Sequence, residues 1–182
     1  MATEAGMISI HFVNTSGAGM MVAPFGGIDR RLSVSPIAAG IPTGEGEPII
    51  LDMSGCAVAE GKVRVALNQG ATLPDGCLID SEGNPTNDPE LFYGDPPGSI
   101  LPIARHKGSG LLFIIELLAG ALTGSSCSNP ENAGRVANGM LSIIMDRAFF
   151  GSAAEFYPEV DRFVEFVKSS RTVDENGEIL LP

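Results

Sequence analysis

Residues 7–27 read MISIHFVNTSGAGMMVAPFGG, and this stretch constrains the fold more than any other. Met7–Val13 predicts a buried strand, because it is short, apolar and partly β-branched and is followed by turn-forming residues. Asn14–Gly27 contains several glycines and a proline. This composition predicts a loop whose backbone comes close to a neighbouring group.

The glycines of this loop do not form a Rossmann fingerprint. Gly17 and Gly19 follow the predicted strand as that motif requires, but Val22 stands where the third glycine belongs. A proline and two glycines within residues 24–27 also prevent a helix from following. Residues 55–63 resemble a P-loop but lack its Ser or Thr ligand for magnesium. Neither common nucleotide-binding loop is therefore expected.

Strands and helices alternate along the rest of the chain. Extended segments are expected at residues 32–41, 48–53, 78–80, 140–146 and, after a turn signal at Asn176 and Gly177, at 179–181. Helices are expected over residues 54–69, from near Leu111 with Ser109 as N-cap and Gly124 as stop, and from Pro158 at a first helical position. This alternation predicts a single α/β domain with a helix layer on each face of a sheet.

Charge and cysteine content exclude several classes of partner. The chain has 182 residues with 22 Asp and Glu against 11 Lys and Arg, a net charge of −11. Such a charge repels phosphate backbones and anionic lipids, so nucleic acids and membranes are not expected partners. Its most apolar stretch, Leu111–Leu122, is too short to span a bilayer. Cys56, Cys77 and Cys127 form no disulfide or zinc pattern, so we expect a soluble, cytoplasmic protein with reduced thiols.

Two places along the chain carry candidate binding residues. Asp52 ends a predicted strand, where an acid either holds ribose hydroxyls or caps the next helix, and the spacing leaves both open. His106 and Lys107 precede a helix start whose free N–H groups would suit an anionic or phosphorylated ligand. The alternative for Lys107 is an ordinary solvated side chain. Because His11 and His106 are the only histidines, a multi-histidine metal site is excluded.

Five segments in one order point to a known family. They are NTSGAGMMVAPFGG (14–27), SVSPIA (33–38), LDMSGCAVAEGKV (51–63), LPDGCLIDSEGNPTNDP (73–89) and HKGSGLLFIIELLAGALTG (106–124). Together they resemble the type-2 malate/L-lactate dehydrogenase family, which includes ureidoglycolate and sulfolactate dehydrogenases, diketogulonate reductase and cyclic-imine carboxylate reductases. The resemblance implies a three-layer, mixed-sheet α/β sandwich of the sulfolactate dehydrogenase type. It also implies a homodimer that binds NAD or NADP without the Rossmann glycines.

The resemblance also implies which residues contact the cofactor. By position they are Ser16, Asp52, Met53, Ser54, His106 and Lys107. No metal ligand is implied. The family's catalytic histidine lies in an Asn-His-x-Gly motif before the segment matched here, so the catalytic residue is not identified in this chain. Residues 1–182 then correspond to the cofactor-binding domain of a longer dehydrogenase, without its N-terminal catalytic segment and its C-terminal end, and we expect this chain alone to be inactive.

Two functions remain open at this stage. The first is an NAD(P)-dependent oxidoreductase domain, in which hydride passes between nicotinamide and a 2-hydroxy acid or its 2-oxo or imine partner. The second is a binding or interaction module that keeps the fold without the chemistry. Gly55 and Cys56 favour the second, because they stand where the family usually has two hydroxyl donors, and so does Cys77, which replaces a tryptophan.

Overall fold

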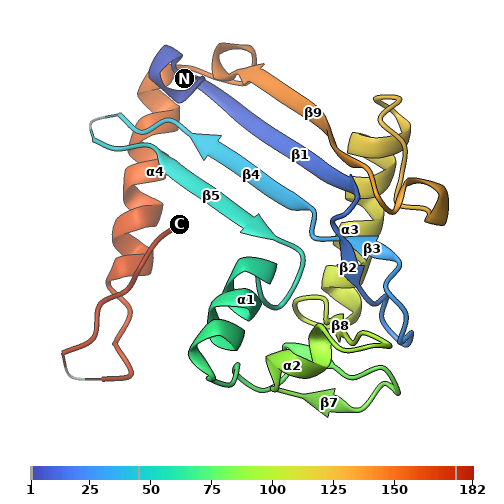
Figure 1. The fold of residues 1–182 in the computed structure, drawn as a ribbon. Helices are drawn as coiled ribbons and strands as arrows, with labels where there is room; N and C mark the ends of the chain where they lie inside the picture. Colours follow the sequence, from blue (N-terminus) through green and yellow to red (C-terminus); the bar gives the residue numbers. More distant parts are fainter. Residues whose placement is uncertain (1, 45, 175) are drawn as a thin grey trace. The chain divides into compact units, whose positions relative to one another are not determined.

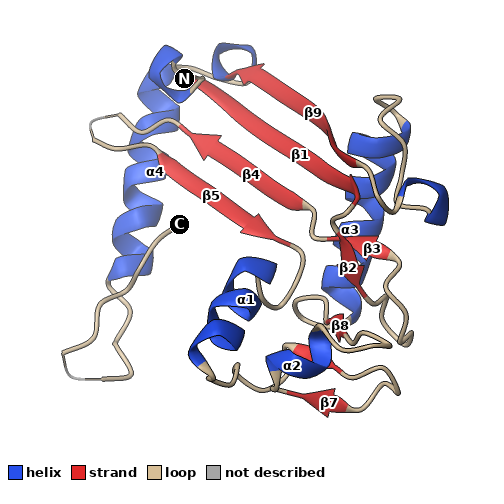
Figure 2. Ribbon diagram, viewed as in Figure 1, coloured by secondary structure: helices blue, strands red, loops and turns tan. Residues whose placement is uncertain are grey.

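The computed structural model describes residues 2–44, 46–174 and 176–182, which form two compact units (Figure 1). Unit 1 comprises Met1–His11, Ala38–Asp52 and Ser142–Pro182, and unit 2 comprises Phe12–Ile37 and Met53–Leu141. A four-stranded sheet has the order β5-β4-β1-β9 (Figure 2). Its strands are β1 (Met7–Gly17), β4 (Pro36–Ile41), β5 (Ile49–Ser54) and β9 (Val136–Asp146). Each of these strands has residues in both units.

Unit 2 contains a second, mixed sheet in the order β3-β2-β8-β6-β7. Its short strands are β2 (Met20–Val22), β3 (Leu32–Ser33), β6 (Leu78–Ile79), β7 (Pro85–Thr86) and β8 (Ser99–Ile100). Strands β2 and β8 are parallel, whereas the other pairs are antiparallel. The helices of this unit are α1 (Glu60–Gln69), α2 (Pro89–Phe92), α3 (His106–Ile115), its π-helical continuation η2 (Glu116–Ala121) and the 3-10 turn η3 (Pro130–Asn132).

The hydrophobic core lies in unit 2. One cluster joins side chains of β2, β3, β6 and β8, of helices α1, α2 and α3, and of the segments between them: Val22, Leu32, Cys56, Val58, Val63, Ala66, Leu73, Cys77, Leu78, Phe92, Ile100 and Leu112. Unit 1 contains η1 (Thr3–Ala5), η4 (Arg147–Phe149) and α4 (Ala153–Lys168) besides its strand segments. Within its described residues, unit 1 buries only Thr3, Ser9, Gly40 and Pro42, so apart from one proline it buries no apolar side chain.

The strand predicted at Met7–Val13 is confirmed but runs on to Gly17, so the prediction of a loop from Asn14 is wrong for its first residues. Two fully buried polar side chains explain the extension. The Asn14 amide donates to the Ser126 carbonyl at 2.9 Å and accepts from the Gly139 N–H at 2.9 Å. The Ser16 hydroxyl donates to the Ala137 carbonyl at 3.0 Å. These partners lie more than a hundred residues away, so polar residues can occupy a buried strand.

Three helix starts differ from the predictions. Helix α1 begins at Glu60 rather than Ser54, because Ser54 ends β5 and Cys56 forms a β-bridge with Pro102. Helix α3 begins at His106, and the predicted N-cap Ser109 lies inside it, where its hydroxyl accepts a hydrogen bond from the Phe25 N–H.

Helix α4 begins at Ala153, so Pro158 lies within the helix and not at its first position. Its start is set by a capping box between Ser152 and Glu155, which satisfies N–H groups at the first turn. The predicted strand at residues 179–181 is also wrong, since the described residues 176–182 have no regular structure. In the part of the chain that the structure describes, no helix is long and apolar enough to cross a membrane.

Candidate functional site

A pocket of about 750 Å³ opens beside the first turn of α3. It lies entirely within unit 2 and is lined by three stretches, residues 24–28, 75–77 and 101–105, together with Ala57, Ile79 and Gly83. Most of these groups are apolar or backbone, while Asp75 and Arg105 carry charge. Pockets that hold cofactor-sized ligands have volumes of roughly 300–1,000 Å³. The size and lining of this pocket therefore suit a cofactor-sized molecule.

Backbone hydrogen bonds hold the start of α3 against the segment that follows β5. The Ile103 N–H donates to the Gly55 carbonyl, and the Gly108 N–H donates to the Ile103 carbonyl, both at 2.9 Å. Nearby, the Ala57 N–H donates to the Leu101 carbonyl at 2.8 Å. These bonds bring the predicted residues Met53 and Ser54 into the same part of unit 2 as the start of α3.

Glycines are required where these segments meet. A Cβ atom on Gly108 would collide with backbone atoms of Ile103 and Gly55, and one on Gly55 would collide with the Leu112 side chain. Gly55 and Leu112 thus fill the space together. The glycine at position 55, where the family usually has a hydroxyl side chain, is therefore explained by packing against Leu112 and does not require a loss of function.

Arg105 and Lys107 give the start of α3 a positive character, and His106 lies between them in the chain. Arg105, His106 and Lys107 are all exposed. The Arg105 guanidinium lies 5.8 Å from the centre of the Phe25 ring, and the His106 ring meets the same ring edge-on at 5.8 Å. The helix macrodipole adds partial positive charge at this end. Together these groups favour an anion beside the pocket.

The prediction of free backbone N–H groups at this helix start is wrong for two of them. The Lys107 N–H donates to the Ala104 carbonyl at 3.3 Å, and the Gly108 N–H donates to Ile103. Ala104 and Arg105 reach this arrangement with positive φ angles of 48° and 59°. Anion binding here would therefore depend mainly on the three side chains and the helix dipole.

The other predicted residues are placed as follows. Ser16 is fully buried and its hydroxyl is engaged with the Ala137 carbonyl, so it does not line the pocket. Asp52 is exposed near the end of β5 and belongs to unit 1, whereas Met53 and Ser54 belong to unit 2. The Ser54 hydroxyl lies 2.9 Å from the Cys56 sulfur. None of the six predicted residues is among those that line the pocket. His106 directly follows the lining residue Arg105 in the chain, and Lys107 comes one residue later.

The cysteines of this region are unreactive in character. Burial raises the pKa of the Cys56 thiol, and the bond to Ser54 only partly offsets this. Burial and the nearby Asp75 carboxylate raise the pKa of the Cys77 thiol, which lines the pocket. Thiolate is the nucleophilic form, so neither side chain is prepared for covalent catalysis.

Sequence reasoning missed Arg105 and Phe25. Arg105 immediately precedes the HKG segment, so its charge was a readable signal. Its position in the pocket depends on a positive φ angle, which composition does not reveal. Within the described residues, no three His, Cys, Asp or Glu side chains gather where they could hold a metal ion.

The chain matches known proteins along its length. Residues 1–182 match the family model described as malate/L-lactate dehydrogenase. Over 98% of the chain, it is 40% identical to hydroxycarboxylate dehydrogenase B of Escherichia coli K12, and it is 38% identical to L-sulfolactate dehydrogenase of Methanothermobacter thermautotrophicus. It spans about half the length of each, 50% and 51%.

Solved structures confirm the fold class. A malate/lactate dehydrogenase structure from E. coli superposes with a TM-score of 0.92 at 39% identity, covering all of this chain and 51% of the other. Sulfolactate dehydrogenase from Methanocaldococcus jannaschii superposes with a TM-score of 0.80 at 34% identity, covering all of this chain and 52% of the other. The predicted α/β fold of the sulfolactate dehydrogenase type, distinct from the Rossmann fold, is therefore confirmed.

Proposed function

Because the chain belongs to the malate/L-lactate dehydrogenase family, we propose that it is the cofactor-binding part of an NAD(P)-dependent 2-hydroxy-acid dehydrogenase. Its relatives are named as hydroxycarboxylate, lactate and sulfolactate dehydrogenases. The cofactor would exchange hydride with C2 of a 2-hydroxy acid or of the corresponding 2-oxo acid. As the family resemblance implies, the complete enzyme would be a homodimer.

The pocket beside α3 is the observation that carries this proposal. A nicotinamide dinucleotide needs apolar walls for its rings and positive charge for its pyrophosphate. The pocket has apolar walls from residues 24–28 and 101–104, and Arg105 at its edge. Gly26 and Gly76 also line it, and a Cβ atom on either would meet nothing within 4 Å. There is thus open space beside the backbone, and the residues present fit the cofactor.

Each proposed contact has a distinct role. Lys107 and Arg105 supply positive charge to the pyrophosphate or the phosphorylated ribose, and His106 adds a hydrogen-bond donor beside them. Met53 and Ser54 contact the cofactor from the end of β5 that belongs to unit 2. The role of Asp52 as an acceptor for ribose hydroxyls is supported by the family resemblance alone. Ser16 is the least supported of the predicted contacts, because its hydroxyl is buried and already bonded.

The proton-transfer group is proposed to lie outside these 182 residues. The family's histidine motif is not found in this sequence, and we assign no acid or base to His11 or His106. His11 bonds to Ser142 at 2.9 Å, and His106 packs against Phe25. This chain alone should therefore bind cofactor without oxidising a 2-hydroxy acid.

A titration with NADH and with NADPH tests the proposal. The chain has no tryptophan, so nicotinamide fluorescence can be followed without an overlapping protein signal. We expect saturable binding, weakened at least about tenfold in Lys107→Ala and in Arg105→Ala, since a hydrogen bond to a charged group contributes roughly 1.5–3 kcal/mol. Lys62→Ala is the matched control, because Lys62 is an exposed lysine on α1 away from the pocket lining. The dinucleotide with the lower dissociation constant identifies the coenzyme.

The opposite result has a defined meaning. Absence of binding by either dinucleotide, also after the segments found in the relatives are added at both ends, would favour the non-catalytic module. Binding that Lys107→Ala and Arg105→Ala leave unchanged would place the cofactor elsewhere and contradict the site.

A further inference from the structure

Unit 1 has apolar surface but no core. Apart from Pro42, its described residues bury no apolar side chain, yet several large apolar side chains are exposed. They include Phe149, Phe150 and Phe163, exposed by 88%, 78% and 63%. Large apolar side chains that are exposed close together often mark a surface that another polypeptide or a ligand covers. The described part of unit 1 therefore exposes apolar side chains in the way that one side of an interface does.

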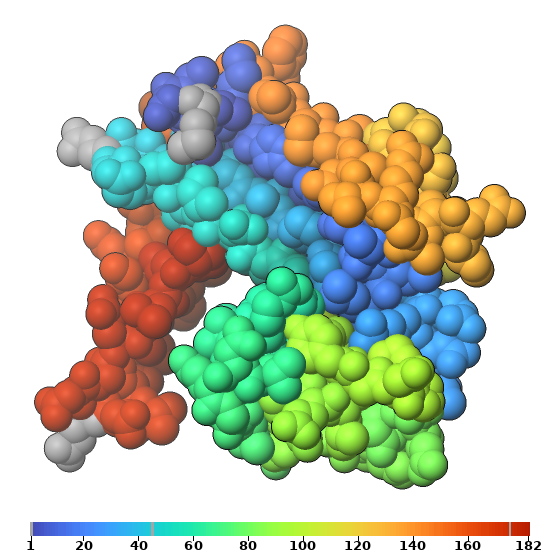
Figure 3. Space-filling model, viewed as in Figure 1, coloured from blue at the N-terminus to red at the C-terminus, as the bar shows by residue number. Residues whose placement is uncertain are grey.

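Two of these side chains, Phe150 and Phe163, line a groove along α4. The groove has a volume of about 470 Å³ and lies wholly within unit 1. Its apolar lining, which we call the α4 groove, consists of Ile8 from β1, Phe150 after η4, and Phe156, Val160 and Phe163 from α4. Figure 3 shows part of α4 at the molecular surface, in orange and red.

The rim of the groove has few charges free to bind an anion or a cation. Glu159 pairs with Arg162, and Glu155 accepts from Ser152 in the capping box. Arg147 donates to the Tyr157 hydroxyl at 3.1 Å and stacks over its ring. The groove therefore suits apolar side chains of a polypeptide better than a charged small molecule.

The chain's relatives indicate what this polypeptide is. The alignment with the E. coli relative is 182 residues long and includes 98% of this chain and half of the relative. Because the alignment is hardly longer than the part of this chain that it includes, it contains few insertions, and most unmatched residues of the relative lie outside it. The unmatched half must therefore lie mainly before the match, after it, or on both sides of it. In this chain both ends belong to unit 1. A segment tethered at either end is held at a high effective concentration beside that unit.

We propose that the α4 groove is the docking surface for the half of a family enzyme's chain that lies outside the match. Apolar side chains of that half fill the groove and complete the core of unit 1. The proposal concerns assembly of the polypeptide and does not depend on cofactor binding in unit 2.

Hydrogen exchange on two proteins tests this docking. One is the 182-residue chain, and the other carries the unmatched segments of E. coli hydroxycarboxylate dehydrogenase B fused at its two ends. We expect amides of α4 to exchange at least tenfold more slowly in the fusion. Amides of α3, whose Leu112 and Ile115 are fully buried in unit 2, report whether the fusion is folded. Should they be unprotected there, the E. coli segments are instead added to the 182-residue chain as separate polypeptides.

A pair of variants locates the contact. Phe163→Glu places a charge in the groove and should abolish the added protection of α4. Phe166→Glu makes the same change on the same helix at an exposed residue outside the groove lining, and should leave the protection intact. Equal exchange of α4 with and without the added segments would overturn the proposal. So would protection of α4 in the 182-residue chain that rises with its own concentration, because a second copy would then cover the groove.

Discussion

At the scale of single residues, a buried carboxylate joins three distant segments of unit 2. Glu116, only 4% exposed, accepts hydrogen bonds from the Ser128 hydroxyl at 2.8 Å and the Ser128 N–H at 2.9 Å. It also accepts from the Ser33 N–H at 3.3 Å and from the Asn14 amide at 3.4 Å. The buried Glu116 carboxylate is tolerated because of these donors, since a buried charge without partners has a high free-energy cost.

Removing this carboxylate should destabilise the protein. Glu116→Ala leaves several buried donors without an acceptor, each costing about 1–3 kcal/mol. We expect the free energy of unfolding in urea to fall by at least ~2 kcal/mol, and by less in Glu116→Gln, which keeps one acceptor oxygen. Glu131→Ala, at an exposed acid of η3, should change it by less than about 0.5 kcal/mol. Equal stabilities of Glu116→Ala and Glu131→Ala would refute this role.

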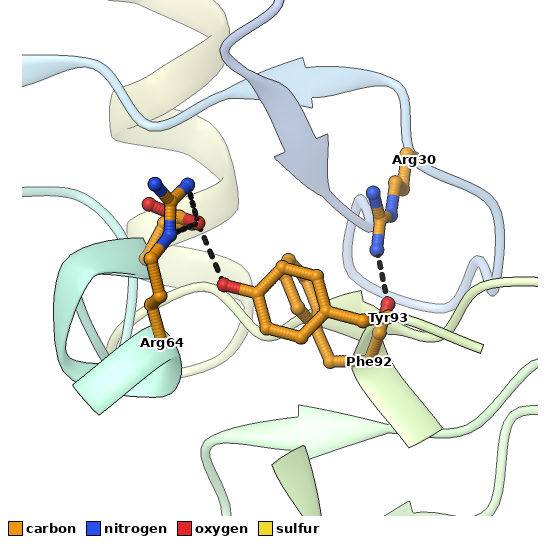
Figure 4. A network of polar contacts seen from close by, with 5 residues as sticks. Arg30, Arg64, Phe92 and Tyr93 are labelled. Atoms are coloured by element: carbon orange, nitrogen blue, oxygen red, sulfur yellow. Dashed lines mark hydrogen bonds and ion pairs between the residues drawn. The ribbon is translucent and has the colours of Figure 1, made fainter. Parts of the chain in front are cut away.

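A second carboxylate links helices α1 and α2 near the surface (Figure 4). Glu60 accepts from the Tyr93 hydroxyl and from Arg64, both at 2.6 Å. Partial burial would raise the pKa of Glu60, but the hydrogen bonds from Tyr93 and Arg64 outweigh it and hold the pKa below its usual value. A lowered pKa means that the stabilisation is present above the pKa of the unfolded chain and is lost as pH falls through the folded value.

Tyr93→Phe should therefore have a pH-dependent cost. We expect a loss of about 0.5–1.5 kcal/mol in the free energy of unfolding at pH 7. This loss should shrink as the pH falls from the pKa of an unfolded glutamate, about 4.3, through the lower pKa of Glu60 in the folded protein. Tyr157→Phe is the control, since that hydroxyl accepts from Arg147 and has no carboxylate bond of this kind. A cost of Tyr93→Phe that is the same at pH 7 and below the folded pKa of Glu60 would show that Glu60 does not mediate it.

At the scale of elements, two glycines of α3 differ sharply in their surroundings. Gly108 lies against the Ile103 and Gly55 backbone, whereas a Cβ atom on Gly110 would meet nothing within 4 Å. Alanine is favoured over glycine inside a helix by about 1 kcal/mol where space allows. The two positions therefore separate helix propensity from packing.

Gly110→Ala should raise the free energy of unfolding by about 0.5–1 kcal/mol and leave NADH affinity unchanged. Gly108→Ala should push the start of α3 away from Gly55, lower the stability and weaken NADH binding at least tenfold. Urea unfolding and the NADH titration measure both effects. Similar behaviour of the two variants would show that the close approach at Gly108 does not shape the site.

Elements with a local sequence signal could be predicted, whereas those set by long-range contacts could not. The strands within residues 7–13, 36–41, 49–53 and 140–146 are confirmed, because their apolar character is local. The helix predicted from near Leu111, with Ser109 as its N-cap, begins instead at His106. Its first turn contains Gly108, which packs against the backbone of Ile103 and Gly55, and such a long-range contact has no local signal. The start of α4 did have a local signal, the Ser152 and Glu155 capping box, which was overlooked in favour of Pro158.

At the scale of the whole molecule, the family could be inferred from sequence because its motifs are short and ordered. The candidate site could be inferred only in part. His106 and Lys107 follow directly on a pocket-lining residue, but Ser16 is bonded within the sheet, by a partner more than a hundred residues away. The contrast between a unit with a core and a unit without one also depends on long-range contacts, which no local pattern encodes.

Mapping of backbone amide NMR shifts on titration with NADH tests the central claim most directly. The account predicts that the perturbed amides cluster in residues 24–28, 75–77 and 101–110, around the pocket beside α3, and that Lys107→Ala reduces these shifts at equal NADH concentration. Two results would contradict it: perturbations confined to unit 1, for example along the α4 groove, or no saturable perturbation even in a chain extended to the length of its relatives.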